Sequence, residues 1–381
     1  MERILGGSWD EQRQRRTSIK WSLWGPEVLP VWVAEMDAAP CPAVVEAVTS
    51  AVRRGDTGYA VEGRYAVALA AYAQDTWGWE VDTALTMGTA DVMIGIEAIL
   101  RQVTTPGGAI VVSPPTYDSF FGFVATTGRR RLDAPLSPEG RLDLPVLDRT
   151  FGEATAGGER AAYLLCNPAN PVGTVPTPEE LSALAALADE HGVTVVSDEI
   201  HAPIVHPGGA AFTSWLTVSD RGFSALSASK AWNLAGFKAA LVIAGAGSAD
   251  DLQGIHEVHT HGVGHIGAIA HMAAFADGRD WLAQVKGELD DNRHLLRRLL
   301  SEHLPQVRMR VPDATYLAWL DFRTMDLGED PAAVIRERAK VAMSSGPNYG
   351  AEAGRGFARF NFATSPEIIT EAVERMADVA G

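Results

Sequence analysis

Cysteine is scarce in this sequence, and long apolar runs are missing. Among 381 residues only Cys41 and Cys166 carry thiols, too few for a disulfide framework, which favours a reducing compartment. No apolar run approaches the length of a membrane span. Residues 1–20 are charged and lack the apolar core of a secretory signal. We therefore expect a cytoplasmic protein that does not enter a membrane.

Positive charge is also in short supply. The chain has 32 Lys and Arg residues against 48 Asp and Glu, a formal net charge of -16. Such a balance argues against nucleic acid or an anionic membrane as a partner. No internal repeat is visible. The length allows a large core and about two domains, and the 46% apolar and 21% charged residues are ordinary for a globular protein.

Short apolar runs and a helix predict a parallel sheet. Residues 109–113, 161–166 and 193–197 are continuously apolar or nearly so, as in strands covered on both faces. A helix over residues 178–192 separates the last two, with Thr177 as its N-cap and a proline at its first position. Strand–helix–strand order indicates a parallel α/β sheet, which binds ligands outside the carboxyl ends of its strands. Asn170, Asp198 and Lys230 are expected at that edge.

The remaining chain is more loosely patterned. We expect an extended arm over residues 1–30, a short strand over 29–34 and a helix over 42–52. From about residue 278 onward helices alternate with short strands. The predicted division is an N-terminal arm with part of a small domain (1–42), a large domain (43–278) and a C-terminal small domain (279–381).

Lys230 is the residue on which the functional prediction mainly depends. It follows an apolar strand and stands among small and apolar residues, where desolvation would lower its pKa and make the neutral amine a Schiff-base nucleophile. Taken alone, a lysine here is better explained as a surface residue at a strand–loop junction, and only the motifs elsewhere in the chain favour the catalytic role. A second feature is the glycine turn at Gly88 before a helix over 92–103, which is a physical anion site but a weak signal by itself.

A series of motifs occurs in order along nearly the whole chain. They are Gly88-Thr89-Ala90-Asp91, Tyr117, Asn167-Pro168-Ala169-Asn170-Pro171-Val172-Gly173, Asp198-Glu199-Ile200-His201, Ser227-Ala228-Ser229-Lys230 and Arg359. This set resembles the class I/II aminotransferase superfamily of pyridoxal-phosphate-dependent, fold-type I enzymes. The resemblance implies an α/β fold with a mostly parallel central sheet, helices on both faces and a smaller α+β domain.

Within that superfamily the chain is most similar to the cystathionine β-lyase-like C–S lyases of the MalY/PatB group. The segment 32–37, His201 where many transaminases have tyrosine, and the run from Gly354 to Asn361 carry this likeness. The sequence departs from the group after Asp37, where an aromatic residue is common. The departure bears on the substrate pocket.

The resemblance implies a role for each matching residue. Lys230 would bond the cofactor and later take the Cα proton, and Asp198 would pair with the pyridine nitrogen and keep it protonated. Tyr117 would stack on the ring and Asn170 would bind its phenolic oxygen. The phosphate would be held by the backbone of Thr89 and Ala90, by Ser227 and by Lys238, where many relatives carry arginine in place of the lysine.

Further implied residues concern the substrate and a partner subunit. Arg359 would bind the substrate α-carboxylate as a bidentate pair, unless it forms a surface salt bridge, and Ala34 would line the substrate site. Tyr59 would reach the phosphate of a neighbouring subunit, which implies a homodimer with sites at its interface. His201 would either contact the cofactor oxygen or merely pack.

A histidine-rich stretch invites a metal site but does not fit one. The five histidines between residues 256 and 271 follow no common zinc spacing, and no cysteine or carboxylate completes them. No metal is expected, and the stretch would instead line the pocket or a subunit interface.

The leading hypothesis is a pyridoxal-phosphate-dependent C–S β-lyase that cleaves cystathionine or a related cysteine S-conjugate to thiol, pyruvate and ammonia. An aminotransferase with a keto acid acceptor would use the same residues. A non-catalytic binding protein is disfavoured because both Lys230 and Asp198 are present.

Overall fold

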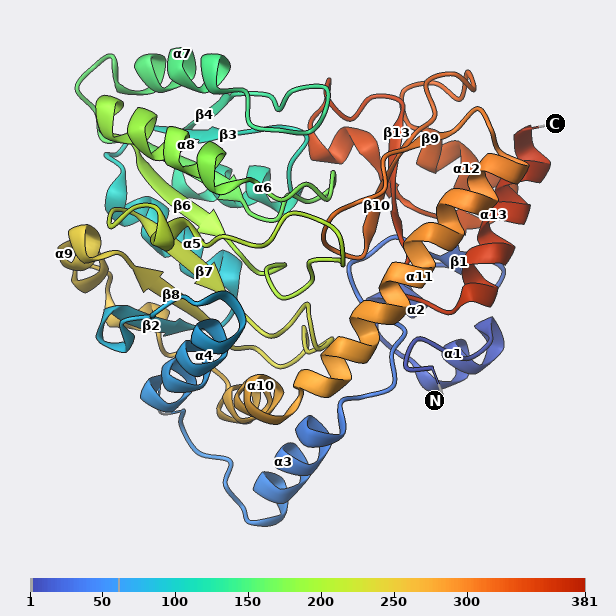
Figure 1. Ribbon diagram of the computed structural model, residues 1–381, viewed down its shortest axis with the longest axis horizontal. Coiled ribbons are helices and arrows are strands. Elements are labelled where there is room, and N and C mark those ends of the chain that lie inside the picture. The colour runs from blue at the N-terminus through green and yellow to red at the C-terminus, as the bar shows by residue number, and fades with distance from the viewer. Residues whose placement is uncertain (1–2, 61, 381) are drawn as a thin grey trace.

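The computed structural model describes residues 3–60 and 62–380, and a seven-stranded sheet forms the centre of its larger part (Figure 1). In spatial order the strands are β2 (Thr86–Thr89), β8 (Ala240–Ala244), β7 (Phe223–Leu226), β6 (Thr194–Asp198), β5 (Ala162–Cys166), β3 (Ala109–Val112) and β4 (Arg130–Asp133). β8 is antiparallel to both of its neighbours, and the pairs from β7 through β4 are all parallel. The predicted mostly parallel α/β sheet is confirmed.

Helices cover both faces of this sheet. One apolar cluster joins α5 (Val92–Val103) and α6 (Ser119–Thr127) to one face, and another joins α7 (Leu144–Thr155) and α8 (Pro178–His191) to the other. Every residue of β3 is buried, which is why its sequence is apolar throughout. α8 begins at the predicted capping box of Thr177 and Glu180, and the left-handed Gly192 ends it.

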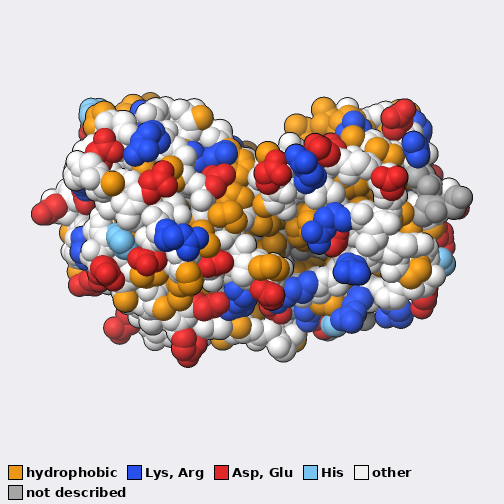
Figure 2. Space-filling model, turned by 90° about the horizontal axis from the view of Figure 1, so that it is seen from above, with side chains coloured by type: hydrophobic (Ala, Val, Ile, Leu, Met, Phe, Trp, Pro, Cys, Tyr) orange, Lys and Arg blue, Asp and Glu red, His pale blue; other side chains and the backbone are white. Residues whose placement is uncertain are grey.

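A second, antiparallel sheet lies on the other side of the molecule, near α12 and α13 (Figure 1). Its strand order is β12 (Ser344–Ser345), β13 (Phe357–Asn361), β10 (Leu317–Asp321) and β9 (Arg308–Met309). The helices of this part are α11 (Arg279–His303), α12 (Pro331–Ala339) and α13 (Pro366–Ala380). Seen from above, the molecule is notched between two lobes, and apolar side chains gather in the notch (Figure 2).

The N-terminal region differs from the expected extended arm. It contains α1 (Trp9–Arg15) and α2 (Ile19–Ser22), and α1 begins at a capping box formed by Ser8 and Glu11. The expected strand over 29–34 is reduced to β1 (Leu29–Pro30), which pairs with β11 (Val341–Ala342). Short helices without a strong apolar period are held by contacts to the rest of the chain, so local pattern does not reveal them.

The remaining helices are α3 (Pro42–Arg53), α4 (Glu62–Trp77), α9 (Ala249–Gln253) and α10 (His265–Asp277). Of these, α10 packs against both α3 and α4. α11, the longest, extends from α10 toward α12 and α13 (Figure 1). Within the described residues, no helix combines the length and the apolar character needed to cross a bilayer. The predicted domain boundaries at residues 42 and 278 remain a prediction.

Candidate active site

A cavity of about 360 Å³ opens where β6 and β7 end, and it also reaches β13 of the second sheet. Its wall contains every predicted site residue except Thr89 and Tyr59. Those present are Ala34, Ala90, Tyr117, Asn170, Asp198, His201, Ser227, Lys230, Lys238 and Arg359. Residues that are up to 325 positions apart in the sequence therefore meet at the edge that the strand order indicated.

Lys230 lies just after β7, where the chain turns away from the sheet. Its Nζ donates to the backbone oxygen of Ala34 at 3.1 Å. Burial, with the nearby Arg359 guanidinium, lowers the pKa of Lys230 to about 8, although the carboxylate of Asp198 partly opposes the shift. A substantial fraction of this amine is neutral near pH 8 and able to act as a base or nucleophile.

Asp198 is the last residue of β6 and is 4% exposed. Its Oδ1 accepts a hydrogen bond from the backbone of Ile200 at 3.1 Å. Burial raises the pKa of Asp198 to about 7, with the Ile200 N–H and the Lys230 charge opposing the rise. Among the described residues no cation forms an ion pair with this carboxyl group within 4.0 Å. A cationic group entering the cavity would therefore find a buried carboxylate there.

Arg359, on β13, is 4% exposed and so is no surface salt-bridge residue. Its Nη1 donates to Asn170 Oδ1 at 3.0 Å, its Nη2 donates to the Trp32 carbonyl at 2.9 Å, and its guanidinium lies 4.9 Å from the Tyr349 ring. Its Nε is buried without a hydrogen-bond partner in the described structure. This fixed guanidinium in the cavity wall supplies a positive charge that suits a carboxylate ligand.

Asn170 and Tyr117 complete the wall beside Arg359. Because Asn170 Oδ1 accepts from Arg359, its amide NH2 group remains for a ligand in the cavity. Tyr117 lies edge-on to Phe120, with ring centroids 5.6 Å apart, and burial raises its pKa. Tyr117 therefore stays protonated near neutral pH and presents a ring and a hydroxyl.

The expected phosphate end of the cavity lies at the start of α5. Asp91 is the N-cap of this helix, and the same carboxylate accepts from Lys238 Nζ at 3.0 Å. The lysine expected to bind phosphate is thus paired with an acidic neighbour in the wall. Ser227 Oγ donates to the Ala239 carbonyl at 2.9 Å. Thr89 is fully buried and does not line the cavity, and its hydroxyl donates a hydrogen bond to the Asp91 carbonyl.

His201 and Tyr59 have contrasting positions. His201 is 3% exposed in the cavity wall, and burial together with the Lys230 charge lowers its pKa to about 3, so its imidazole is neutral. Its Nδ1 has no hydrogen-bond partner among the described residues. Tyr59 is fully exposed and does not line the cavity. A second subunit would be needed to bring such a tyrosine to this site.

The histidine-rich stretch does not gather into one cluster. His265 pairs with Asp56 at 2.9 Å, and the fully buried His271 is hydrogen-bonded to the Tyr65 hydroxyl at 3.0 Å. Searching the described residues finds no group of three or more potential metal ligands. Gly262 lies so close to Ala90 that a Cβ there would approach the Ala90 Cβ to 2.9 Å. Gly262 therefore lies beside the expected phosphate end of the cavity.

Sequence reasoning did not foresee how the segment 32–36 is held. Each of its five consecutive carbonyl oxygens accepts from at least one side chain of a distant element. The donors are Arg359 and Ser344 to Trp32, Asn361 to Val33, Lys230 and Tyr316 to Ala34, Asn361 and Lys20 to Glu35, and Asn233 and Arg16 to Met36. These bonds replace a β-ladder and fix an irregular segment against the cavity.

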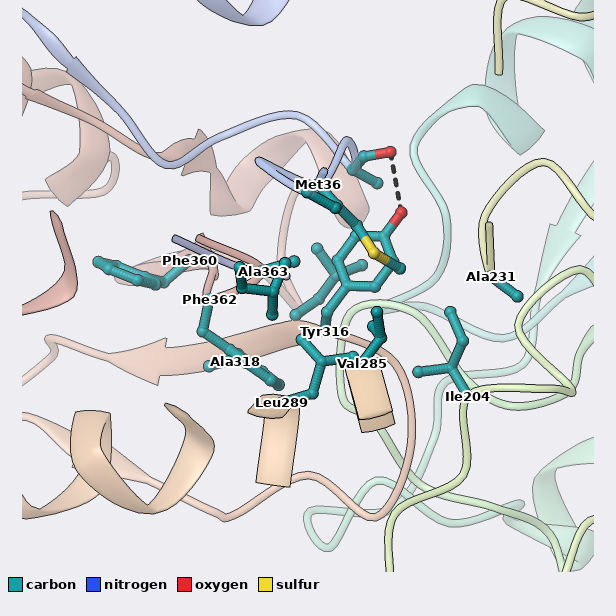
Figure 3. Packing of buried hydrophobic residues seen from close by; sticks show 14 of the residues in the cluster. Met36, Ile204, Ala231, Val285, Leu289, Tyr316, Ala318, Phe360, Phe362 and Ala363 are labelled. Carbon is teal, nitrogen blue, oxygen red and sulfur yellow. Dashed lines mark hydrogen bonds between the residues drawn. The ribbon is translucent and has the colours of Figure 1, made fainter. Parts of the chain in front are cut away.

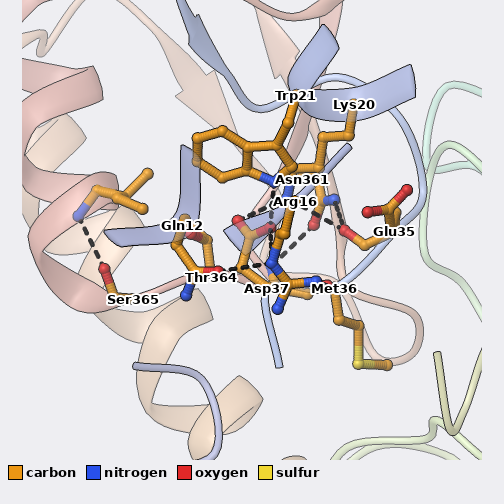
Figure 4. A network of polar contacts seen from close by, with 12 residues as sticks. Gln12, Arg16, Lys20, Trp21, Glu35, Met36, Asp37, Asn361, Thr364 and Ser365 are labelled. Atoms are coloured by element: carbon orange, nitrogen blue, oxygen red, sulfur yellow. Dashed lines mark hydrogen bonds and ion pairs between the residues drawn. The ribbon is translucent and has the colours of Figure 1, made fainter. Parts of the chain in front are cut away.

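A buried ion pair anchors the far end of this segment (Figure 4). Lys20 Nζ lies 2.7 Å from Asp37 Oδ2, and both side chains are fully buried. Trp21 Nε1 donates to the other carboxylate oxygen at 2.9 Å, and Arg16 lies 3.9 Å from it. The only signal for this anchor in the sequence was a lysine in a chain with five of them.

Comparisons with known proteins bear on this site. The sequence profile described as aminotransferase class I and II matches residues 33–376. The chain belongs to that family. A Mycobacterium leprae protein named "Putative cystathionine beta-lyase" is 45% identical, covering 96% of this chain and 95% of that protein. Cystathionine beta-lyase of Corynebacterium glutamicum is 30% identical, with coverages of 97% and 98%.

Two solved structures are similar to this chain. The crystal structure of a "putative plp-dependent beta-cystathionase" from Corynebacterium diphtheriae is 34% identical, with a TM-score of 0.91 and 99% of each chain covered. A pyridoxal-phosphate-bound C–S lyase from Staphylococcus hominis, 23% identical with a TM-score of 0.87 and 96% of each chain covered, shares the fold. Recognition of this pyridoxal-phosphate-dependent superfamily, and of the cystathionine β-lyase group within it, is confirmed.

Proposed function

We propose that the protein is a pyridoxal-phosphate-dependent C–S β-lyase that cleaves cystathionine or a related cysteine S-conjugate to thiol, pyruvate and ammonia. The observation that carries the proposal is the meeting of a partly neutral lysine, a buried carboxyl group and a buried arginine in one cavity. The relatives named above, whose names specify cystathionine β-lyase or β-cystathionase, support the lyase over other reactions of the family.

The residues of the cavity fit pyridoxal phosphate. Asp198 is a buried carboxyl group without a cationic partner in the described structure, and it would hold the ring nitrogen in its protonated form. Tyr117 would lie against the ring and the free NH2 group of Asn170 would donate to its oxygen. Lys238, Ser227 and the start of α5 would hold the phosphate, with the α5 dipole adding to the attraction.

The bound cofactor would supply an electron-withdrawing ring that stabilises negative charge at the substrate Cα. Arg359 would bind the α-carboxylate, because its guanidinium is already fixed by Asn170 and Trp32 in the cavity wall. The amine of Lys230 would take the proton from Cα, a role that its lowered pKa permits near neutral pH. The C–S bond would then break with its electrons on sulfur, and the thiolate would leave and take up a proton. Water would hydrolyse the remaining three-carbon fragment to pyruvate and ammonia.

The test is a product assay on purified protein reconstituted with pyridoxal phosphate. With L-cystathionine and no added keto acid, we expect pyruvate and thiol in equal amounts. Turnover that requires a keto acid acceptor, with no thiol released, would contradict the lyase and identify an aminotransferase. The same assay with a small S-alkyl cysteine would show whether other cysteine conjugates are substrates.

We also propose that the protein is a cytoplasmic homodimer. Tyr59 is fully exposed and stands apart from its own cavity, as expected of a residue that reaches the phosphate of a second copy. Val45 and Val52 of α3 are 46% and 55% exposed, an apolar surface that a partner copy would cover. Light scattering should give twice the mass of one chain, and Tyr59→Phe should weaken cofactor retention; a monomer that keeps full activity would contradict the assignment.

A further inference from the structure

Tyr316 follows a residue with an unusual backbone conformation beside the candidate active site. The residue before it, Thr315, has φ of 71°, a left-handed conformation that a β-branched residue rarely adopts. Three contacts hold it there: its N–H donates to Ile204 at 2.8 Å, its carbonyl oxygen is bonded to His206 Nε2 at 2.6 Å, and its hydroxyl accepts from the Leu317 N–H at 3.1 Å. Strain of this kind persists where the surrounding structure requires a particular geometry.

The consequence of this geometry is the direction of the Tyr316 side chain. The ring is 1% exposed, and its hydroxyl donates to the Ala34 carbonyl at 3.0 Å (Figure 3). The same carbonyl accepts from Lys230 Nζ at 3.1 Å. One backbone oxygen thus receives both a permanent phenolic donor and the lysine of the active site.

The carbonyl itself cannot shift easily. On either side of Ala34, the carbonyls of Val33 and Glu35 each accept from Asn361 Nδ2 at 2.7 Å. Burial raises the pKa of Tyr316 far above the neutral range, so its hydroxyl always carries its proton. Tyr316 is therefore a fixed donor to a fixed acceptor.

We propose that Tyr316 is a positioning residue for Lys230 and acts through the Ala34 carbonyl. When Lys230 is hydrogen-bonded to the Ala34 carbonyl, the hydroxyl hydrogen of Tyr316 points at the same oxygen. Its partial positive charge disfavours the charged ammonium form of Lys230. When the lysine swings into the cavity, Tyr316 keeps the buried carbonyl hydrogen-bonded, which removes the cost of leaving that oxygen without a donor. The second half of this role rests on the proposed function, and the first half does not.

Removing the Tyr316 hydroxyl leaves the charged groups around Lys230 in place, so the effect of the hydroxyl on Lys230 can be measured by itself. Asp198 and Glu35 favour the ammonium, whereas Arg359 and Lys238 oppose it, and the neutral His201 lies edge-on to the Tyr316 ring with centroids 5.9 Å apart. Tyr316→Phe removes the phenolic oxygen and keeps the ring packed against His201.

The experiment is a pH titration of the cofactor-free protein. The rate at which cyanate modifies Lys230 is followed by peptide mass spectrometry as a function of pH. In Tyr316→Phe we expect the midpoint to rise by roughly 0.5 to 1 pH unit, the equivalent of one hydrogen bond. The matched control is Tyr163→Phe, which removes another buried hydroxyl, 2.9 Å from Ser113 Oγ and outside the cavity wall. It should leave the Lys230 midpoint in place.

A Lys230 midpoint that is equal in wild type and Tyr316→Phe, or that moves as much in Tyr163→Phe, would overturn the proposal. A second arm measures pyridoxal phosphate binding by absorbance, where Tyr316→Phe should weaken affinity on the order of tenfold. If neither protein binds the cofactor while the apo midpoints still differ, the proposed function fails and the role of Tyr316 on Lys230 stands.

Discussion

Two walls of the cavity are built on different principles. On one wall, Asp198 ends β6 and Lys230 lies just after β7, and the parallel backbone ladder between these two strands sets their positions. On the other wall, the segment 32–36 forms no β-ladder. Its carbonyl oxygens accept hydrogen bonds from side chains of the N-terminal helices, of the loop that contains Lys230 and Asn233, and of the second sheet. In the proposed reaction the first wall supplies the reactive groups, and the second wall holds the Ala34 carbonyl that accepts a hydrogen bond from Lys230.

This difference predicts whether a substitution in each wall should reduce activity or stability. Replacing a reactive side chain on the strand ends should abolish activity and leave the fold in place. Replacing a donor to the segment 32–36 or to Asp37 should first destabilise the fold or the geometry, since each donor satisfies a buried polar group. Lys230 is the exception, because the Ala34 carbonyl keeps Tyr316 as a donor when the lysine is removed. Four substitutions separate these outcomes.

The largest effect is expected for Lys230→Ala. Activity with cystathionine should fall on the order of 10⁴-fold or more, because the variant loses both the nucleophile and the base. Pyruvate formation measures it, and thermal unfolding should show a stability close to that of wild type. Residual activity within tenfold of wild type would mean that another group takes the Cα proton.

Lys20→Met tests the anchor of the other wall. It leaves the fully buried Asp37 carboxylate without its ammonium partner, which should lower the free energy of unfolding by roughly 3–5 kcal/mol. Urea denaturation of the apo protein measures the loss. The control is Arg221→Met, which breaks an exposed pair with Asp189 and should change stability by only about 0–1 kcal/mol. Equal effects would contradict the anchoring role.

Glu199→Gln tests the buried carboxyl group that follows Asp198 in the sequence. Burial raises the pKa of Glu199 from 4.5 to about 7, so the folded state binds its proton more tightly than the unfolded state does. Stability from this group is full below pH 4.5 and is lost as the pH rises through 7, an effect on the order of 3 kcal/mol. Asp198 adds a slope of the same sign, which the variant retains.

The measurement for Glu199 is urea unfolding of the apo protein across that range. Glutamine can keep the bonds to the Trp215 N–H and to Ser214, so the variant should show about half of the wild-type decline. An unchanged slope would assign the pH dependence to other groups.

The smallest effect is expected for Arg359→Lys, where the walls meet. An ammonium keeps the charge and loses the simultaneous bonds to Asn170 and the Trp32 carbonyl. We expect kcat/KM to fall roughly 30-fold, mainly through KM, with the α-carboxylate less firmly held. Steady-state kinetics decide it, and an unchanged KM would place the carboxylate elsewhere.

The same two walls mark what sequence could predict. Asp198, Asn170 and Lys230 were placed at one edge because strand order and local motifs determine where strand ends lie. The bonds to the segment 32–36 join residues up to 328 positions apart, and no local pattern encodes them. Tyr316 was missed for that reason, and so were α1 and α2, which the rest of the chain stabilises.

The most direct test of the account is to locate the cofactor on the chain. Protein loaded with pyridoxal phosphate is reduced with borohydride, digested and mapped by mass spectrometry. The sequence offers only five lysines, Lys20, Lys230, Lys238, Lys286 and Lys340. We expect the phosphopyridoxyl mass on Lys230 alone. Label on Lys238 or on the other lysines, with Lys230 unmodified, would contradict it.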